Sequence, residues 1–385
     1  PAGATAAHDL ALQGHSVLLL DRAGRIKPCG GAIPPRLIRD FEIPDHLLKA
    51  RISNARMISP SGQVVQMPVD GGYVGMVDRE EFDEWLRERA ASGGAERRKG
   101  TFSKISRDPD GRSVVTYEAR DDKGETRTER VRARFVIGAD GALSAVGKQA
   151  VPGADRLRYV FAYHEIIEAP PAGEVEDYDP RSCDIYYRGK LSPDFYAWVF
   201  PHGPTASVGV GSAHKGFSLK DATSATRAAA GLSNARTRLR EGAPIPMKPL
   251  KRWDNGRDVI LAGDAAGVVA PASGEGIYYA MYTGRLVGEA VAEALRCGDA
   301  RALAQARKRF MKAHGRVFWI LSIMQWFWYS SDKRRESFVA ICRDKDVQRL
   351  TWESYMNKEL VRTKPVAHVR IFFKDLAHLV GFAKA

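Results

Sequence analysis

The sequence predicts a mixed α/β fold, in which an α/β domain with parallel strands carries an inserted α+β domain with an antiparallel sheet and a helical C-terminal region. Three apolar runs, ending near residues 20, 138 and 262, each lead into a turn rich in glycine or aspartate, as buried parallel strands do. Residues 113–119 and 126–133, and three further runs between 184 and 213, have the spacing and turns of antiparallel strands. After Gly276 the sequence is helical to its end.

These elements divide the chain into domains. We expect the α/β domain in residues 1–70, 75–150 and 250–295, the antiparallel domain in residues 151–249, and the helical region in residues 296–385. The 385 residues are enough for two domains with substantial cores. The sequence begins with Pro1 and shows neither an initiator methionine nor a leader, so we expect it to start inside a longer protein.

Composition limits the classes of protein that fit. Hydrophobic residues make up 44% and charged residues 27%, which is typical of globular proteins. The four cysteines form no C-x-x-C pair, so we expect no metal site and no disulfide framework, and a reducing cytoplasmic setting is the default. The net charge of +13 fits an anionic substrate or membrane surface. No nucleic-acid recognition motif accompanies it, so we expect no nucleic-acid partner.

The first 22 residues are typical of the second half of a dinucleotide-binding βαβ unit. An alanine-rich helix, a turn at Gly14 and a buried strand over 16–20 lead to Asp21. Gly3 corresponds to the last glycine of the fingerprint, which permits close packing of helix and strand. Asp21 stands about 20 residues after the turn, where a carboxylate accepts hydrogen bonds from a ribose. A simple turn residue is the alternative for Asp21.

Two later motifs strengthen the nucleotide-binding interpretation. One apolar strand ends in Gly-Ala-Asp-Gly, with Asp140 and Gly141, and another ends in Ala-Gly-Asp, with Gly263 and Asp264. Open α/β sheets bind ligands at the carboxyl ends of their strands, and glycine lets the backbone approach a ligand closely.

Seven segments together resemble a known family. They are KPCGGAIPPRLI, MVDREEFDEWLRERA, RFVIGADGALS, FYAWVFPHG, SVGVGSA, LAGDAAGVVAPASGEGI and MQWFWYSSDKRRESFVAICRDKDVQ. They resemble flavoproteins of the p-hydroxybenzoate hydroxylase type and, among these, the geranylgeranyl reductases of chlorophyll and bacteriochlorophyll biosynthesis. The resemblance covers essentially the whole chain. It implies a Rossmann-like FAD-binding domain, FAD as cofactor and NADPH as a reductant that has no domain of its own.

The resemblance also implies which residues bind the cofactor. Asp21 would contact the adenosine ribose, Asp140 would lie near the pyrophosphate and also serve nicotinamide binding, and Asp264 would contact the ribityl chain. Arg79 would lie beside the flavin, and the loop from Gly267 to Gly276 would bring backbone N–H groups to its ring. The full implied set is Gly3, Asp21, Cys29, Gly30, Gly31, Arg79, Asp140, Gly141, Gly263, Asp264, Gly267, Gly274 and Gly276.

Catalysis and substrate binding are predicted from two further motifs. The resemblance implies that Cys29 lies near the substrate double bond, where it is a candidate proton donor; an inert buried thiol is the alternative. Tyr196, Trp198 and Phe200 alternate along a predicted strand and therefore share one face. With Tyr187, they are expected to form a wall of the substrate cavity; core packing is the alternative.

Two segments near the C-terminus are candidates for contact with a lipid surface. The apolar run 317–329 is shorter than the ~20 residues that span a bilayer, so it fits a buried helix or an apolar rim for a lipid-like substrate. Residues 367–385 have the pattern of a basic amphipathic helix, which either binds a membrane interface or packs on its own domain. We expect a cytoplasmic protein, peripheral on a photosynthetic or inner membrane.

Three functions follow from these predictions. The first is NADPH-driven, FAD-dependent reduction of isolated double bonds of a geranylgeranyl group to phytyl, on geranylgeranyl (bacterio)chlorophyll or geranylgeranyl diphosphate. The second is a flavin-dependent aromatic monooxygenase on the same scaffold. The third is a non-catalytic escort that binds prenylated partners. The Cys-Gly-Gly stretch and the basic, aromatic C-terminal third favour the reductase.

Overall fold

The chain forms two compact units, each built from separate stretches of sequence. The computed structural model describes residues 1–22, 27–120 and 125–358. The first unit contains Pro1–Lys27, Arg79–Tyr159 and Pro244–Trp319, and the second contains Pro28–Asp78, Val160–Ala243 and the residues from Ile320 onward. The domain assignment made from the sequence places 28–70 with the nucleotide-binding segments, whereas these residues lie in the second unit. Compactness does not locate a bound nucleotide, so that assignment stays a prediction.

The first unit confirms the predicted parallel strands. β1 (Leu18–Asp21) pairs in parallel with β7 (Glu96–Lys99), and β11 (Val136–Gly138) pairs in parallel with β17 (Val259–Leu261). A three-stranded antiparallel sheet follows the order β10 (Thr126–Ala133), β9 (Ser113–Arg120), β8 (Thr101–Arg107). The predicted hairpin is thus confirmed in β9 and β10, and part of its turn, residues 121–124, lies outside the described residues.

Helices complete the first unit. Gly14 ends the first of them, because its positive φ of 80° turns the chain while its N–H group bonds to the carbonyl of Ala11. The helices and helical turns are α1 (Ala2–Leu12), α3 (Arg79–Ser92), α4 (Ala145–Ala150), η2 (Ala154–Arg156), η3 (Gly263–Ala266), α6 (Ile277–Cys297), η4 (Ala300–Leu303) and the first part of α7 (Ala304–Trp328).

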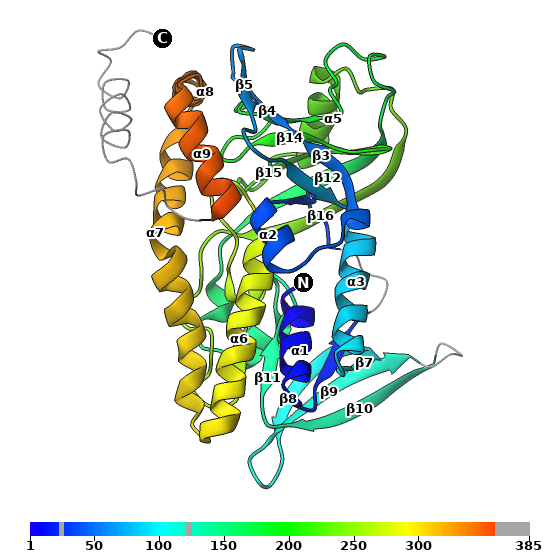
Figure 1. Ribbon diagram of the computed structural model, residues 1–385, viewed down its shortest axis with the longest axis vertical. Helices are drawn as coiled ribbons and strands as arrows, with labels where there is room; N and C mark the ends of the chain where they lie inside the picture. Colours follow the sequence, from blue (N-terminus) through cyan, green and yellow to red (C-terminus); the bar gives the residue numbers. More distant parts are fainter. Residues whose placement is uncertain (23–26, 121–124, 359–385) are drawn as a thin grey trace. The chain divides into compact units, whose positions relative to one another are not determined.

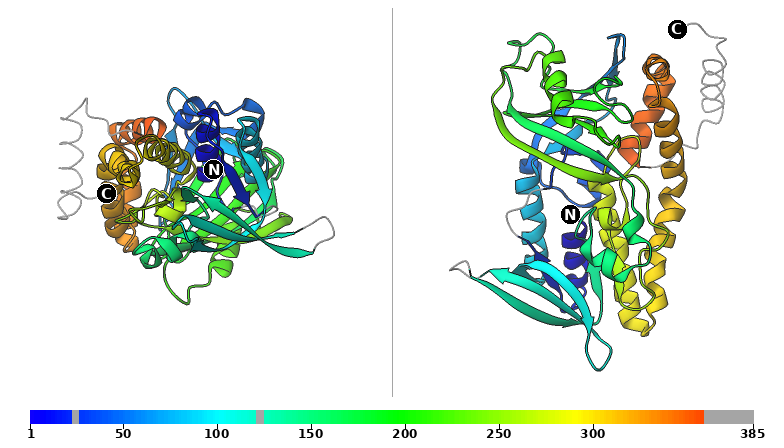
Figure 2. Two further views of the ribbon diagram at one scale, coloured as in Figure 1. Left: turned by 90° about the horizontal axis from the view of Figure 1, so that it is seen from below. Right: turned by 180° about the vertical axis from the view of Figure 1, so that it is seen from behind.

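Two contacts of α6 hold these helices together. On one side α6 packs on α1, where a β-carbon on Gly284 would lie 2.4 Å from the carbonyl oxygen of Ala2 (Figure 1). On the other side the ring of Tyr279 packs at 6.1 Å from the ring of Phe310 and at 4.9 Å from that of Phe318, both on α7. Figure 2 shows α6 and α7 side by side.

The second unit is built on a seven-stranded sheet. Its order is β16 (Thr237–Pro246), β12 (Tyr159–Glu168), β15 (Thr205–Ser212), β14 (Ala197–His202), β13 (Ser182–Tyr186), β4 (Asn54–Ile58), β5 (Val64–Pro68). The pairs β12–β15, β15–β14, β14–β13 and β4–β5 are antiparallel, and β13–β4 is parallel. The predicted strands are confirmed, with β13 beginning two residues before position 184 and β14 one residue after Tyr196.

Smaller elements surround this sheet. A three-stranded sheet follows the order β2 (Ala32–Ile33), β6 (Val74–Val77), β3 (Leu48–Ile52). The helices are α2 (Pro35–Asp40), η1 (Asp45–Leu47), α5 (Leu219–Ala229), the last part of α7, α8 (Asp332–Ile341) and α9 (Lys345–Asn357). The amphipathic stretch predicted at 367–385 lies outside the described residues.

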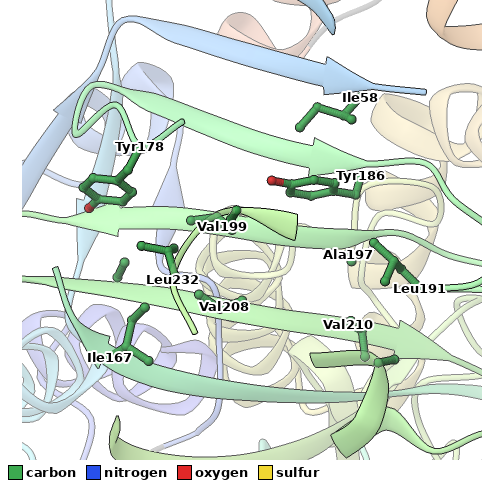
Figure 3. Packing of buried hydrophobic residues seen from close by; sticks show 13 residues of the cluster. Ile58, Ile167, Tyr178, Tyr186, Leu191, Ala197, Val199, Val208, Val210 and Leu232 are labelled. Carbon is green, nitrogen blue, oxygen red and sulfur yellow. The ribbon is translucent and has the colours of Figure 1, made fainter. Parts of the chain in front are cut away.

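One face of the seven-stranded sheet covers a hydrophobic core. Ala197 and Val199 of β14 and Val208 and Val210 of β15 point into it, with Tyr186 of β13 beside them (Figure 3). Since successive side chains of a strand point to opposite faces, Trp198 and Phe200 lie on the other face. The alternation of side chains along β14 therefore places the hydrophobic core on one face of the sheet and the aromatic residues of the predicted substrate wall on the other.

The contact between α1 and α6 yields a stability prediction. Gly284→Ala should lower the melting temperature, because its methyl group overlaps the Ala2 carbonyl and overpacking costs about 1–3 kcal/mol. Gly288→Ala, one turn further along α6, is the matched control, since its β-carbon would lie 3.6 Å from the Ala6 oxygen. Both changes gain about 1 kcal/mol of helix propensity. A melting temperature of Gly284→Ala that equals or exceeds that of Gly288→Ala would contradict the packing described.

Candidate functional site

The implied cofactor residues of the first unit begin at α1. A β-carbon on Gly3 would lie 3.1 Å from the β-carbon of Ala139, which directly follows β11. Helix and strand segment therefore approach each other closely, as the fingerprint glycine requires. Gly3 lies in the first turn of α1, where amide groups have no acceptor four residues earlier and are available to an anion.

Asp21 ends β1, and an arginine holds its carboxylate. Arg87 of α3 places Nε 3.2 Å from Oδ1 of Asp21 and also bonds to Glu84 at 3.1 Å. Arg87 is largely buried, so the orientation of the Asp21 carboxylate is restricted. Arg87 was not among the predicted site residues; the signal for it in the sequence is its position two turns after Arg79 on the same helix.

Arg79 and Asp83 form a buried ion pair at the start of α3. The guanidinium donates from Nε to Oδ1 at 2.8 Å and from an Nη to Oδ2 at 2.7 Å, and both residues are less than 9% exposed. Burial alone would raise the pKa of Asp83, but the contact with Arg79 outweighs it and holds this pKa below the ordinary value. The pair fixes the plane of the guanidinium that the resemblance places beside the flavin.

The Asp140 carboxylate is held by hydrogen bonds from the residues that follow it. Its carboxylate accepts hydrogen bonds from the Ser144 hydroxyl and from the N–H groups of Ala145 (2.7 Å) and Val146 (3.1 Å), and so caps α4. Gly141 has a φ of 86°, which turns the chain away from the strand. The Asp-Gly motif thus shapes the turn after β11, and its contact with pyrophosphate stays a prediction.

The Gly-Asp loop lies between β17 and α6. Asp264 is 6% exposed and forms an ion pair with Lys27, the first residue of the KPCGGAIPPRLI segment. Positive φ angles of 61° at Gly263, 77° at Gly267 and 64° at Gly274 fold the loop back on itself. At Gly267 a β-carbon would meet the Lys248 carbonyl oxygen at 2.4 Å, which excludes any side chain there.

These residues fit a flavin dinucleotide. The loop ends at Gly276, the residue before the 21-residue helix α6, and a β-carbon there would lie 3.4 Å from the Val269 side chain and 3.8 Å from Asp264 Oδ1. Asp21 is an acceptor for a diol, the first turns of α1 and α6 offer amide donors to phosphate or a flavin ring, and Asp264 is a buried acceptor. The donor set is therefore of the kind that FAD needs, and Arg79 adds a fixed positive charge.

In the second unit the Cys29 segment leads into β2. The N–H group of Gly31 lies 3.4 Å from the Cys29 sulfur, and the carbonyl of Gly31 accepts from the Val77 N–H group at 2.9 Å. The imidazole of His202 bonds to the Gly30 carbonyl at 3.0 Å. Cys29 is half-buried, whereas Cys183 and Cys342 are buried and Cys297 is exposed; all four are free thiols.

The predicted aromatic residues form one continuous group. The ring centroids of Tyr187 and Tyr196 are 6.3 Å apart, those of Tyr196 and Trp198 6.0 Å, and those of Trp198 and Phe200 6.0 Å. The shared face of the three alternating residues is confirmed. Phe200 also packs against the small buried cluster of Ile52, Val74, Met76 and Cys183, so part of this face contributes to a core as well.

Two aromatic residues of the C-terminal segment extend the group. Tyr329 and Phe338 place their rings 5.3 Å and 5.0 Å from that of Tyr187. Burial raises the pKa of the Tyr187, Tyr196 and Tyr329 hydroxyls well above the ordinary value of tyrosine. These phenols stay neutral and are poor proton donors. The segment that contains Tyr329 and Phe338 carries part of the family resemblance, and only the fold shows that it contacts Tyr187.

Trp198 is held by a buried polar chain. Its indole N–H donates to the Ser207 hydroxyl at 3.0 Å, and that hydroxyl lies 2.9 Å from Nδ1 of His164. Nε2 of His164 lies 3.3 Å from a carboxylate oxygen of Glu241. The indole plane is therefore fixed by its neighbours within the sheet, as a preorganised binding surface requires.

Two kinds of feature are absent from the described part of the chain. Among the residues described, no group of three or more His, Cys, Asp and Glu side chains is placed to hold a metal ion. No helix within the described ranges combines the length and apolar character needed to cross a bilayer.

Comparison with known proteins identifies relatives over nearly the full chain. The FAD binding domain family matches residues 1–314. A geranylgeranyl diphosphate reductase of Rhodobacter capsulatus is 57% identical over 99% of this chain and 95% of its own length. A Synechocystis protein of the same name is 36% identical over 99% of this chain and 96% of its own.

Solved structures show the same fold at low identity. A geranylgeranyl bacteriochlorophyll reductase-like protein of Thermoplasma acidophilum superimposes with a TM-score of 0.80 at 22% identity, over 95% of this chain and 96% of the other. A flavin-dependent brominase gives a TM-score of 0.74 at 16% identity, over 97% and 96%.

The Arg79–Asp83 pair yields a pH prediction. Because the folded pKa of Asp83 is lowered, its contribution to stability is complete above the ordinary value of about 3.9 and is lost as pH falls through the lower folded value. Asp83→Asn should cost about 3–5 kcal/mol at pH 7, since it removes the carboxylate that balances the buried charge of Arg79. The difference from wild type, read from denaturant titrations, should shrink below about pH 4.

A surface pair supplies the control. Asp45 is 76% exposed and forms an ion pair with Arg51. Asp45→Asn should lower the free energy of unfolding by less than about 1 kcal/mol, and this difference should not change with pH in the same way. If Asp83→Asn and Asp45→Asn lower the free energy of unfolding equally at pH 7, the buried pair is not a stabilising contact.

Proposed function

Since this chain belongs to the FAD binding domain family and, within it, to the geranylgeranyl diphosphate reductases, we propose that it uses FAD and NADPH to reduce isolated double bonds of a geranylgeranyl group to phytyl. The substrate is geranylgeranyl diphosphate, geranylgeranyl (bacterio)chlorophyll or both. The observation that carries the proposal is the 57% identity to a geranylgeranyl diphosphate reductase over nearly the full length of both chains.

The chemistry sets clear demands on the protein. An isolated alkene has no carbonyl to polarise it, so protonation of one carbon must accompany hydride transfer to the other. Bound FAD, once reduced by NADPH, supplies the hydride. The protein must hold the cofactor, orient an apolar chain, tolerate transient positive charge on carbon and deliver one proton for each bond reduced.

Residues of the first unit would hold FAD. Gly3 and Asp21 suit the adenosine end, and the Gly263-Asp264 loop with the start of α6 suits the ribityl chain and ring. Arg79, fixed by Asp83, offers a positive charge that would favour the electron-rich reduced ring. These roles are carried over from the family motifs, and the packing, ion pairs and φ angles described above support them.

Residues of the second unit would bind the prenyl chain. Tyr187, Tyr196, Trp198 and Phe200 offer ring faces, which contact methyl branches and stabilise developing positive charge. They lie on the sheet face opposite the hydrophobic core of Figure 3. The fixed indole of Trp198 supports a binding role, since an orienting chain of polar partners is more than core packing needs.

Cys29 is our candidate proton donor. It is half-buried, and its segment belongs to the same unit as the aromatic residues. The neighbouring phenols are less suitable, because burial raises the pKa values of Tyr187 and Tyr196 and makes them weaker acids. The Cys29 segment is also the one that the resemblance places near the substrate double bond, and a general acid must lie within reach of the atom that it protonates.

Peripheral contact with an anionic membrane is part of the proposal. Trp319, Ile323 and Trp326 lie on one side of α7 and are 65%, 42% and 75% exposed. Lys308, Lys312 and Arg316 continue the same side toward the start of the helix, and α7 contains no acidic residue. Exposed tryptophan beside lysine and arginine is typical of helices that lie at a lipid interface. The enzyme would then work from the cytoplasm on a photosynthetic or inner membrane.

The reductase proposal predicts a specific change of mass. Full-length protein with FAD, NADPH and either geranylgeranyl substrate, without oxygen, should add two hydrogens per reduced bond in an NADPH-dependent manner, as read by mass spectrometry. A hydroxylated product that requires oxygen would favour the monooxygenase instead. A complete protein without a flavin spectrum that still binds prenylated ligand would favour the escort.

A matched pair of variants tests the proton donor. Cys29→Ser should keep its flavin absorbance but lose at least about 100-fold in kcat, as loss of a general acid does. Cys297→Ser, which changes an exposed thiol, is the control. Full alkene reduction by Cys29→Ser would remove Cys29 from this role.

The exposed face of α7 predicts vesicle binding. The triple variant Trp319→Ser, Ile323→Ser, Trp326→Ser should sediment at least tenfold less with vesicles rich in phosphatidylglycerol. The control changes three scattered exposed residues, Leu12→Ser, Val64→Ser and Leu239→Ser. Wild-type binding should weaken in high salt. Equal sedimentation of the two triple variants would rule out α7 as the membrane contact.

A further inference from the structure

One buried histidine connects three parts of the second unit. His202, the last residue of β14, is 4% exposed. Its Nε2 atom lies 3.0 Å from the Gly30 carbonyl oxygen, and its Nδ1 atom lies 3.0 Å from a carboxylate oxygen of Asp78. The ring therefore joins β14 both to the segment before β2 and to the residue that follows β6.

Both partners of the ring are hydrogen-bond acceptors. A neutral imidazole has one N–H group and one bare nitrogen, so it can satisfy only one acceptor, whereas an imidazolium donates from both nitrogens. The Asp78 carboxylate, whose side chain is 44% exposed, is an acceptor only. Asp78 is the charged partner among the described contacts of the ring, and Thr205, opposite His202 on β15, is neutral.

The ring also explains the glycines after Cys29. A β-carbon on Gly31 would lie 2.4 Å from Cε1 of His202 and 2.5 Å from the Val77 carbonyl oxygen, and one on Gly30 would lie 2.9 Å from the Phe200 ring. Side chains of β14 thus occupy the space that side chains at positions 30 and 31 would need. The Cys29 sulfur is in turn placed by the N–H group of Gly31 at 3.4 Å.

We propose that His202 is an imidazolium paired with Asp78, and that it is a positioning residue that fixes the Cys29-Gly30-Gly31 segment on β14. Because Trp198 and Phe200 belong to the same strand, β14 then sets the place of the thiol relative to the aromatic face. The consequence for catalysis rests on the function proposed above, whereas the protonation state of His202 and the placement of Cys29 do not.

The test measures protonation and thiol access directly. All variants carry Cys297→Ser, which removes the exposed thiol. With ¹⁵N-labelled histidine at pH 7, the chemical shifts should show both nitrogens of His202 protonated in the parent and one bare nitrogen in Asp78→Asn. Alkylation of Cys29 by iodoacetamide, read by mass spectrometry, should be at least threefold faster in Asp78→Asn and His202→Gln. His214→Gln, which changes an exposed histidine, should match the parent.

Activity separates positioning from general damage. In full-length enzyme, kcat of His202→Gln should fall at least tenfold while KM changes less than twofold. If His202→Gln does not fold, Asp78→Asn carries the test, because its amide keeps the size and one acceptor oxygen of the carboxylate. A bare nitrogen on His202 in the parent, or unchanged alkylation in Asp78→Asn, overturns the inference. If the chemical shifts and the alkylation rates are as expected but the enzyme reduces no prenyl double bond, the proposed function is wrong and the inference about His202 stands.

Discussion

Close approach of one backbone segment to another is the constraint on which both units depend. At Gly284 helix α6 meets the Ala2 carbonyl, at Gly267 the loop after β17 meets the Lys248 carbonyl, and at Gly31 the chain meets the Val77 carbonyl; a β-carbon would lie within 2.6 Å of each oxygen. Nothing larger than hydrogen fits at these positions. The first contact seats α1, the second folds the loop that suits FAD, and the third seats the Cys29 segment. The packing and the candidate chemistry therefore both depend on having glycine at these three positions.

Charged side chains are placed beside several of the predicted site residues. Asp83 orients Arg79, Arg87 orients Asp21, and Asp78 faces the ring that holds Gly30. By contrast, Asp184 lies in the sheet beside Arg56, and burial still raises its pKa to about 6. Isolated buried pairs contribute little net stability, because desolvation offsets their attraction. Their value here is orientation, since a guanidinium or carboxylate held on two sides presents its remaining edge in one direction.

Much of this could be predicted from the sequence, because periodicity and glycine placement are local properties. The antiparallel strands, the parallel runs before the Gly-Asp motifs, and the shared face of Tyr196, Trp198 and Phe200 all follow from neighbours in the chain. Contacts over long sequence separations could not be predicted. Arg87 with Asp21, Lys27 with Asp264 and Tyr329 with Tyr187 depend on how distant segments pair. The sequence also suggested one reason for Gly30 and Gly31, namely approach to a cofactor, whereas packing against Phe200 and His202 supplies a second.

The interleaving of the two units has a consequence for biosynthesis. The chain changes unit after residues 27, 78, 159, 243 and 319, so the first unit is complete only once residue 319 has left the ribosome. Because residues 28–78 and 160–243 of the second unit separate the segments of the first, the two units cannot fold one after the other in the order of synthesis. Tyr329 and Phe338 are made long after Tyr187, so these two contacts of its ring form late. Ribosome stalling after residue 243 would leave two incomplete units rather than one finished domain.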